Sequence, residues 1–111
     1  MKNYTNQNSI TPSVDAQHLR GKSQWASLGA VVATSSVAAH FSENNIEIST
    51  YLSRHLQGDW GDVPPEDIIE NDFAARNGLR VLSAYMAANR RIWIITEADR
   101  SVTTFLFPEE Y

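Results

Sequence analysis

The sequence contains no cysteine, which excludes a disulfide framework, thiolate chemistry and thiolate metal sites. It has no apolar run of the roughly 18 residues that a membrane-spanning helix requires, and residues 1–10 lack the apolar segment of a secretory signal. A phosphate-binding loop, a nucleophile elbow, a His-Glu-x-x-His zinc motif and a dinucleotide fingerprint are absent as well. These absences predict a cytoplasmic protein with no membrane span, no cofactor and no metal ion.

Basic residues are outnumbered by acidic ones. The chain has 9 Lys and Arg against 13 Asp and Glu, and its net charge is −4. Residues 1–42 carry a basic excess, whereas residues 43–111 carry twelve carboxylates against six arginines. A protein that binds a phosphate backbone needs a cationic face, so the composition argues against a nucleic-acid partner. An acidic body remains compatible with binding a basic protein surface.

The distribution of polar residues divides the chain into two parts. Residues 1–26 are polar and show no sustained period, which predicts a flexible N-terminal extension. Residues 27–111 have the length of a single domain. Their patterns predict an α+β fold, in which an early strand and three short helices precede a three-stranded antiparallel meander. The three strands follow from period-two patterns joined by short turns, over residues 79–86, 91–96 and 102–107.

Side-chain alternation assigns the residues of this meander to two faces of a sheet. One face is predicted to hold Trp93, Ile95 and Phe105, and the other Ile92, Ile94 and Leu106. Both faces are then partly apolar. We expect one to carry the helices and the other to be covered by the N-terminal extension or by a partner.

The three helices are delimited by capping residues. Thr34, Ser35 and Ser36 are the candidates to cap the first helix, and Gly58 is expected to end the second. Asp62 is predicted to cap the third, which has a proline and the carboxylates of Glu66 and Asp67 in its first turn. The Asn-Gly pair that follows this helix is typical of a left-handed ending.

The most unusual stretch lies between Asp59 and Asp72, where six carboxylates occur without a basic residue. It opens with the turn Gly58-Asp-Trp-Gly-Asp62. The tryptophan of this turn, Trp60, is interpreted either as an exposed aromatic anchor for a partner or as a core residue folded back onto the sheet. The predicted contact surface combines this stretch with the N-terminal extension and the charged turn at residues 96–101. Its residues are Asp59, Trp60, Asp62, Glu66, Asp67, Glu97 and Arg100.

A second hypothesis gives the chain an enzymatic role. His55 would act as an acid or base, assisted by Asp59, Glu97 or Arg100, in a small hydrolase or toxin-like enzyme. This requires the groups to converge in one cleft. The simpler interpretation leaves His55 at the end of a helix, where the dipole favours its charged form. It also leaves Arg100 in local ion pairs of a hairpin turn.

Five motifs carry a resemblance to a known family. They are Arg54-His-Leu-Gln-Gly-Asp-Trp-Gly-Asp62, Asn71-Asp72, Leu82-Ser-Ala-Tyr85, Ile92-Trp-Ile-Ile-Thr-Glu-Ala-Asp-Arg-Ser-Val-Thr-Thr104 and Pro108-Glu-Glu-Tyr111. With them, about residues 28–111 resemble a family of small bacterial proteins carried on plasmids, integrative elements and phages. The resemblance implies an accessory protein of mobile genetic elements. It supplies no catalytic residues.

The sequence therefore favours a non-enzymatic function. We expect a small accessory protein of mobile elements that acts by protein–protein interaction, with an anti-CRISPR or anti-restriction role as one concrete version. The alternatives are the enzyme described above and an antitoxin-like partner with an exposed apolar patch on the open sheet face. The oligomeric state is left open.

Overall fold

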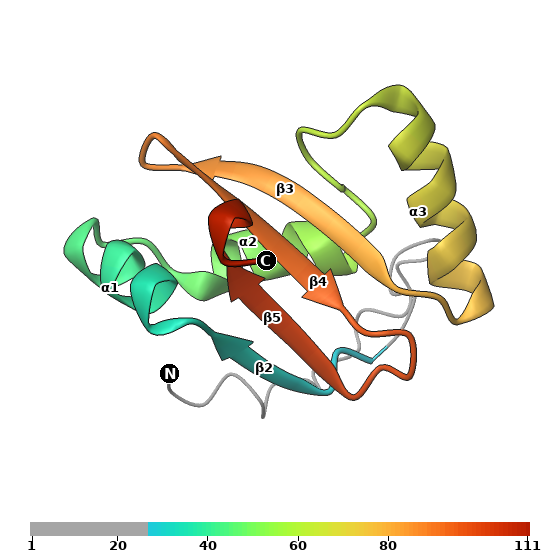
Figure 1. Ribbon diagram of the computed structural model, residues 1–111, viewed down its shortest axis with the longest axis horizontal. Helices are drawn as coiled ribbons and strands as arrows, with labels where there is room; N and C mark the ends of the chain where they lie inside the picture. Colours follow the sequence, from blue (N-terminus) through green and yellow to red (C-terminus); the bar gives the residue numbers. More distant parts are fainter. Residues whose placement is uncertain (1–26) are drawn as a thin grey trace.

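The structure is a computed structural model that describes residues 27–111; the extension predicted over residues 1–26 lies outside them. The described chain has the predicted α+β fold, with three helices and a four-stranded sheet (Figure 1). Its elements follow in the order β2 (Ala30–Ala33), α1 (Ser35–Glu43), α2 (Ile48–Leu56), α3 (Pro65–Asn77), β3 (Val81–Ala87), β4 (Arg90–Thr96), β5 (Val102–Leu106) and the 3₁₀ turn η3 (Pro108–Glu110).

The sheet has the strand order β2-β5-β4-β3. Strands β3, β4 and β5 form the antiparallel meander that the short turns predicted. The early strand β2 joins the edge of this meander, parallel to β5, with Ala30 opposite Val102. The sheet is therefore mixed and has one strand more than the predicted meander. At the opposite edge, Gly61 forms an isolated parallel bridge with Ala84 of β3.

The register of β5 differs from the predicted one. Ile94 pairs with Phe105, and Trp93 pairs with Leu106. Phe105 therefore lies on the same face as Ile92 and Ile94, and the predicted grouping of Phe105 with Trp93 is wrong. A shift of one residue moves every side chain of a strand to the other face, and the turn between β4 and β5, not the alternation, sets this register.

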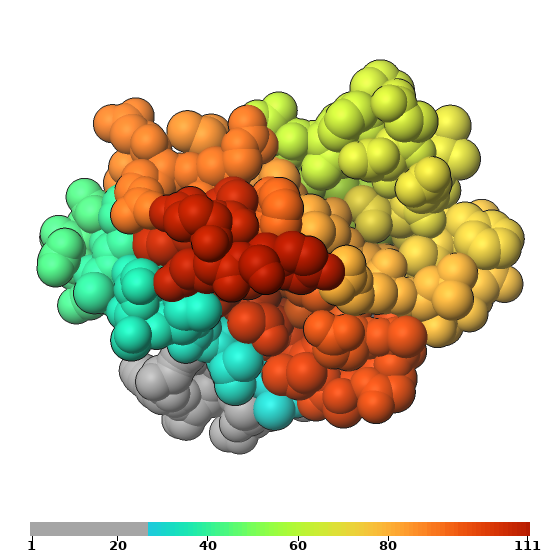
Figure 2. Space-filling model, viewed as in Figure 1, coloured from blue at the N-terminus to red at the C-terminus, as the bar shows by residue number. Residues whose placement is uncertain are grey.

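The helices α1 and α2 pack against one face of the sheet; in Figure 1, α2 lies behind the strands and α1 lies at their left. The main core forms there from Val37 and Phe41 of α1, Ile48 of α2, and Ile92, Ile94 and Phe105 of the sheet. The other face is partly covered by the chain's last described residues, which cross it in Figure 2. On that face the rings of Tyr111 and Trp93 meet edge to face at 5.7 Å.

The helix ends follow the capping signals with one exception. The Thr34 side chain accepts a hydrogen bond from the backbone N–H of Val37 at 3.2 Å and begins α1. Gly58 and Gly78 adopt the left-handed backbone expected after α2 and α3, with φ of 81° and 69°. The exception is the start of α3, where Pro64 occupies the N-cap position. The prediction that Asp62 caps α3 is wrong, because its carboxylate instead binds Arg91 at 3.1 Å.

Candidate protein-binding surface

Helix α3 buries its small side chains and exposes its large apolar ones. Its buried residues are Asn71, Ala74 and Ala75. Ile69 and Phe73, one turn apart on the opposite side, are 71% and 54% exposed. A surface helix ordinarily turns its large apolar side chains to the core. In α3 this arrangement is inverted. Two questions follow: which contacts hold the buried side in place, and what the exposed apolar side binds.

Asn71 is the anchor of the buried side. Its Nδ2 donates to the carbonyl oxygen of Leu82 at 2.9 Å, and its Oδ1 accepts from the Leu82 N–H at 3.2 Å. The amide thus satisfies both backbone groups of one residue in the edge strand β3. Ala74 and Ala75 are small enough to let the helix approach Trp60 and Val81, with which they form a second buried cluster.

Trp60 is part of this second core and is only 3% exposed. Its Nε1 donates to the Asp72 carboxylate at 2.9 Å, and its ring meets the imidazole of His55 edge to face at 5.8 Å. The interpretation of Trp60 as an exposed anchor is therefore wrong, and its interpretation as a core residue is confirmed. The bridge between Gly61 and Ala84 explains the burial, because it fixes the turn against β3 and directs the indole under α3.

The exposed side of α3 carries the side chains of Glu66, Ile69, Glu70, Phe73 and Arg76, and Leu79 and Arg80 extend it beyond the helix. We call these seven residues the α3 strip. The helix stands out from the body of the protein in Figure 2, at the upper right in yellow. An open groove of about 600 Å³ runs along the strip, lined by Ile69, Glu70, Asn71, Phe73, Ala74, Leu79 and Arg80. Leu79, which lines the groove beyond the end of the helix, is 48% exposed.

Charge is separated along the α3 strip. Glu66 and Glu70 lie toward the start of the helix, and Arg76 lies in its last turn. Arg80, beyond the helix, donates from its guanidinium to the hydroxyl of Tyr111 and lies over that ring. Within residues 27–111, Glu66 and Glu70 have no ion-pair partner. Asp67 is half-buried on the inner side of the helix. The strip is therefore acidic at one end, apolar in the middle and basic at the other end.

The two aspartates of the turn, by contrast, pair within the chain. Asp59 accepts from Nε of Arg54 at 2.7 Å, and this bond, more than any other contact, holds the pKa of Asp59 below its usual value. Asp62 pairs with Arg91 at 3.1 Å. Both ion pairs are about half exposed and contribute little stability individually. They fasten the turn to α2 and β4 around an open groove of about 350 Å³.

His55 is fully buried and lies in a chain of side-chain hydrogen bonds across the inner face of the sheet. Its Nδ1 is 2.6 Å from Oγ of Ser83, and its Nε2 is 2.9 Å from Oγ1 of Thr96. The chain continues from Thr96 to Thr103 at 2.7 Å. Burial, together with the charge of Arg100, lowers the pKa of His55 to about 3. The expectation that the helix dipole favours a charged His55 is therefore wrong, because the ring points into the core.

Arg100 closes the C-terminal end of α3. Its guanidinium donates to the carbonyl oxygens of Leu79 at 2.7 Å, Ala74 at 3.1 Å and Ala75 at 3.3 Å. It also donates to the carbonyl of Glu97 in its own turn at 3.1 Å. Orphan carbonyls at a helix end are satisfied in this way by a side chain from elsewhere in the fold. This role is not predictable from the sequence, because hydrogen bonds to backbone oxygens leave no residue pattern.

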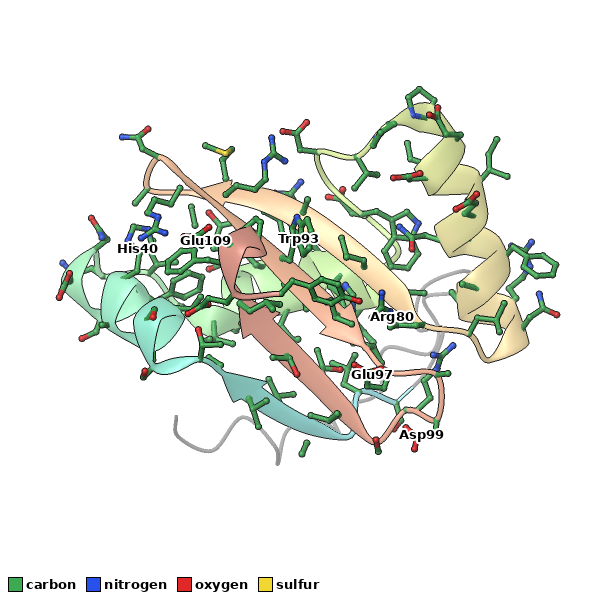
Figure 3. The ribbon with its side chains drawn as sticks, in the orientation of Figure 1. His40, Arg80, Trp93, Glu97, Asp99 and Glu109 are labelled. Carbon is green, nitrogen blue, oxygen red and sulfur yellow. The ribbon has the colours of Figure 1, made fainter. Side chains whose placement is uncertain are left out.

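The residues of the enzyme hypothesis do not share an open cleft. Asp59 borders the smaller groove with Arg54 and Tyr85, whereas His55 has no exposed surface. Glu97 lies in the turn between β4 and β5, as Figure 3 shows. A general acid or base must reach the proton that it transfers, so this geometry does not favour His55 in that role.

Comparison with protein-family models, with curated proteins and with solved structures finds no match to this chain. The resemblance to mobile-element proteins therefore stays a prediction. Among residues 27–111, no cluster of three or more His, Cys, Asp or Glu side chains is placed to hold a metal ion. In the same part of the chain, no helix has the length and apolar character to cross a membrane.

Proposed function

We propose that this chain is a small accessory protein of a mobile genetic element that acts through protein–protein contacts made by the α3 strip. The observation that carries the proposal is the inverted burial of α3, in which Ile69 and Phe73 face outward while two alanines and an asparagine face the core. The mobile-element part is supported by the sequence resemblance. An anti-CRISPR or anti-restriction role is its most concrete version.

The energetics of the strip favour a protein partner. Burying a large apolar side chain that was exposed stabilises a complex by about 1.5–3 kcal/mol. Ile69, Phe73 and Leu79 are each about half exposed or more, so a partner that covers all three gains several such contributions. Contiguous apolar surface rimmed by polar residues is typical of a protein interface. The charged residues at both ends of the strip form such a rim and supply orientation.

Site-specific photo-crosslinking tests the proposal. A photoreactive phenylalanine analogue replaces Phe73 in the full chain, and in a matched variant it replaces Met86, which is 51% exposed on β3 and lies outside the strip. Irradiation in the native host should yield a covalent protein adduct from position 73 and much less from position 86. Mass spectrometry then identifies the captured chain, whether it is a different protein or a second copy.

Adducts of equal yield from both positions, or none from position 73, would sink the proposal. The anti-defence version has its own test. Expressing the chain in a host with an active CRISPR or restriction system should raise the plating efficiency of a phage that the system targets. The exposed substitutions Ile69→Ser and Phe73→Ser should abolish this effect while leaving the melting temperature unchanged.

A further inference from the structure

We infer that the occupant of the α3 strip is a second copy of this chain, bound by antiparallel pairing of α3 with α3. The inference rests on the proposed function, because it takes the strip to be a protein interface. It commits to the partner and to its orientation. The two-fold symmetry of such a pair is the commonest symmetry of soluble oligomers.

The charges of the strip are self-complementary in this orientation. In an antiparallel pair that sets Ile69 of one copy against Phe73 of the other, Glu66 of each copy faces Arg76 of the other. The symmetry repeats the contact at the other end of the interface. Near the centre, the carboxylate of Asp72 is turned away from the strip, toward the indole N–H of Trp60. Opposed helix dipoles also favour the antiparallel arrangement.

The apolar residues are self-complementary as well. Ile69 and Phe73 lie at the middle of the strip, between the two charged ends, so an antiparallel pair sets Ile69 of one copy against Phe73 of the other. The groove that Phe73 and Leu79 help to line is open and has a volume of about 600 Å³, which provides room for a large side chain of the second copy. Interdigitation of this kind is how paired helices fill their contact.

Other occupants fit the strip less well. Parallel pairing would set Glu66 against Glu66 and Arg76 against Arg76, and like charges in contact weaken association. A uniformly basic partner would match Glu66 and Glu70 but oppose Arg76 and Arg80. A uniformly acidic partner would match the arginines but would be repelled by Glu66 and Glu70.

Charge reversal tests the pairing in the full chain. Glu66→Arg and Arg76→Glu each create two like-charge contacts, and each should weaken dimerisation by about tenfold or more in sedimentation equilibrium. Mixing the two single variants should restore association as a heterodimer, because each then supplies the charge that the other lacks. The double variant should restore the homodimer. Glu43→Arg, with the same charge change at an exposed site at the end of α1, is the matched control and should leave dimerisation unchanged.

Several outcomes overturn the inference. The inference fails if the wild-type chain stays monomeric at about 1 mM. It also fails if the dimer tolerates both charge reversals. A crosslink from position 73 to another protein, or to residues 1–26 of the same chain, also overturns it but leaves the α3 strip as an interface. If position 73 yields no adduct and the chain does not associate, the inference and the proposed function fail together.

Discussion

At the scale of single residues, His55 shows how burial fixes a charge state. Its ring lies between Ser83 and Thr96, with hydrogen bonds at both nitrogens. Because desolvation penalises the charged form, the pKa of His55 is lowered from 6.5 to about 3. The folded chain therefore holds this side chain neutral at pH values where the unfolded chain has already bound a proton.

This difference predicts acid sensitivity. A group whose pKa is lower in the folded state loses stabilisation as the pH falls below its unfolded value. For His55 the affected window runs from pH 6.5 down to about 3, with a slope of at most about 1.4 kcal/mol per pH unit. Urea unfolding of the wild type and of His55→Gln at pH 7 and pH 5 measures how much stability each protein loses on acidification. If both lose the same free energy of unfolding, His55 is not the source of the acid sensitivity.

Two glycines with similar backbones offer a matched pair. Gly61 and Gly78 have φ of 80° and 69°. A Cβ at Gly61 would lie 2.1 Å from the carbonyl oxygen of Ala84, whereas one at Gly78 would meet nothing within 4 Å. We expect Gly78→Ala to lower the free energy of unfolding by about 1 kcal/mol, because the only penalty is the left-handed backbone. Gly61→Ala should lower it by at least about 2 kcal/mol more, because the added Cβ also collides with β3. Equal melting temperatures for the two variants would contradict the contact between the turn and β3.

At the scale of elements, the ends of the helices were predictable because they are local. A capping side chain or a left-handed glycine acts within a few residues of its own position, as Thr34 and Gly78 do. The orientation of α3 was not predictable, because the Asn71 amide and the alanines select the inner side only when β3 and Trp60 are in place. The burial of Trp60 could not be decided from the sequence for the same reason.

The start of α3 yields a prediction about Asp62. Its carboxylate makes a half-exposed ion pair with Arg91 and does not cap the helix. Asp62→Ala should therefore change the free energy of unfolding by less than about 1 kcal/mol. Thr34→Ala, which removes the cap of α1, should cost about 1 kcal/mol. A larger loss from Asp62→Ala than from Thr34→Ala, in chemical denaturation, would restore Asp62 as the organising residue of the turn.

At the scale of the whole molecule, the described chain has two cores of unequal size. The larger joins α1 and α2 to the sheet, and the smaller holds α3 through Trp60, Ala74, Ala75 and Val81. Local openings follow contiguous units with few connecting contacts. We therefore expect α3 to open without the rest of the sheet.

Trp60→Ala tests this division. The substitution should destabilise the smaller core by about 3–5 kcal/mol. It should therefore accelerate amide hydrogen exchange throughout α3. Protection of β4 and β5 should persist, since their buried contacts lie mainly in the larger core. Ile69→Ala, on the exposed side of the same helix, is the control and should alter neither region. Simultaneous loss of protection in α3 and the sheet would mean that the two cores unfold as one unit.

The pairing of β2 with β5 has a consequence for the order of folding. Leu28 accepts a hydrogen bond from Thr103, 75 positions further along the chain, and every strand partner of β2 within the described residues belongs to β5. During synthesis, β2 and α1 leave the ribosome well before the strand on which they pack. Long-range pairings of this kind slow folding and leave apolar surface open in the meantime. The nascent chain is therefore expected to hold Val31 and Phe41 exposed until β5 emerges, which makes it a client for chaperones that bind apolar segments.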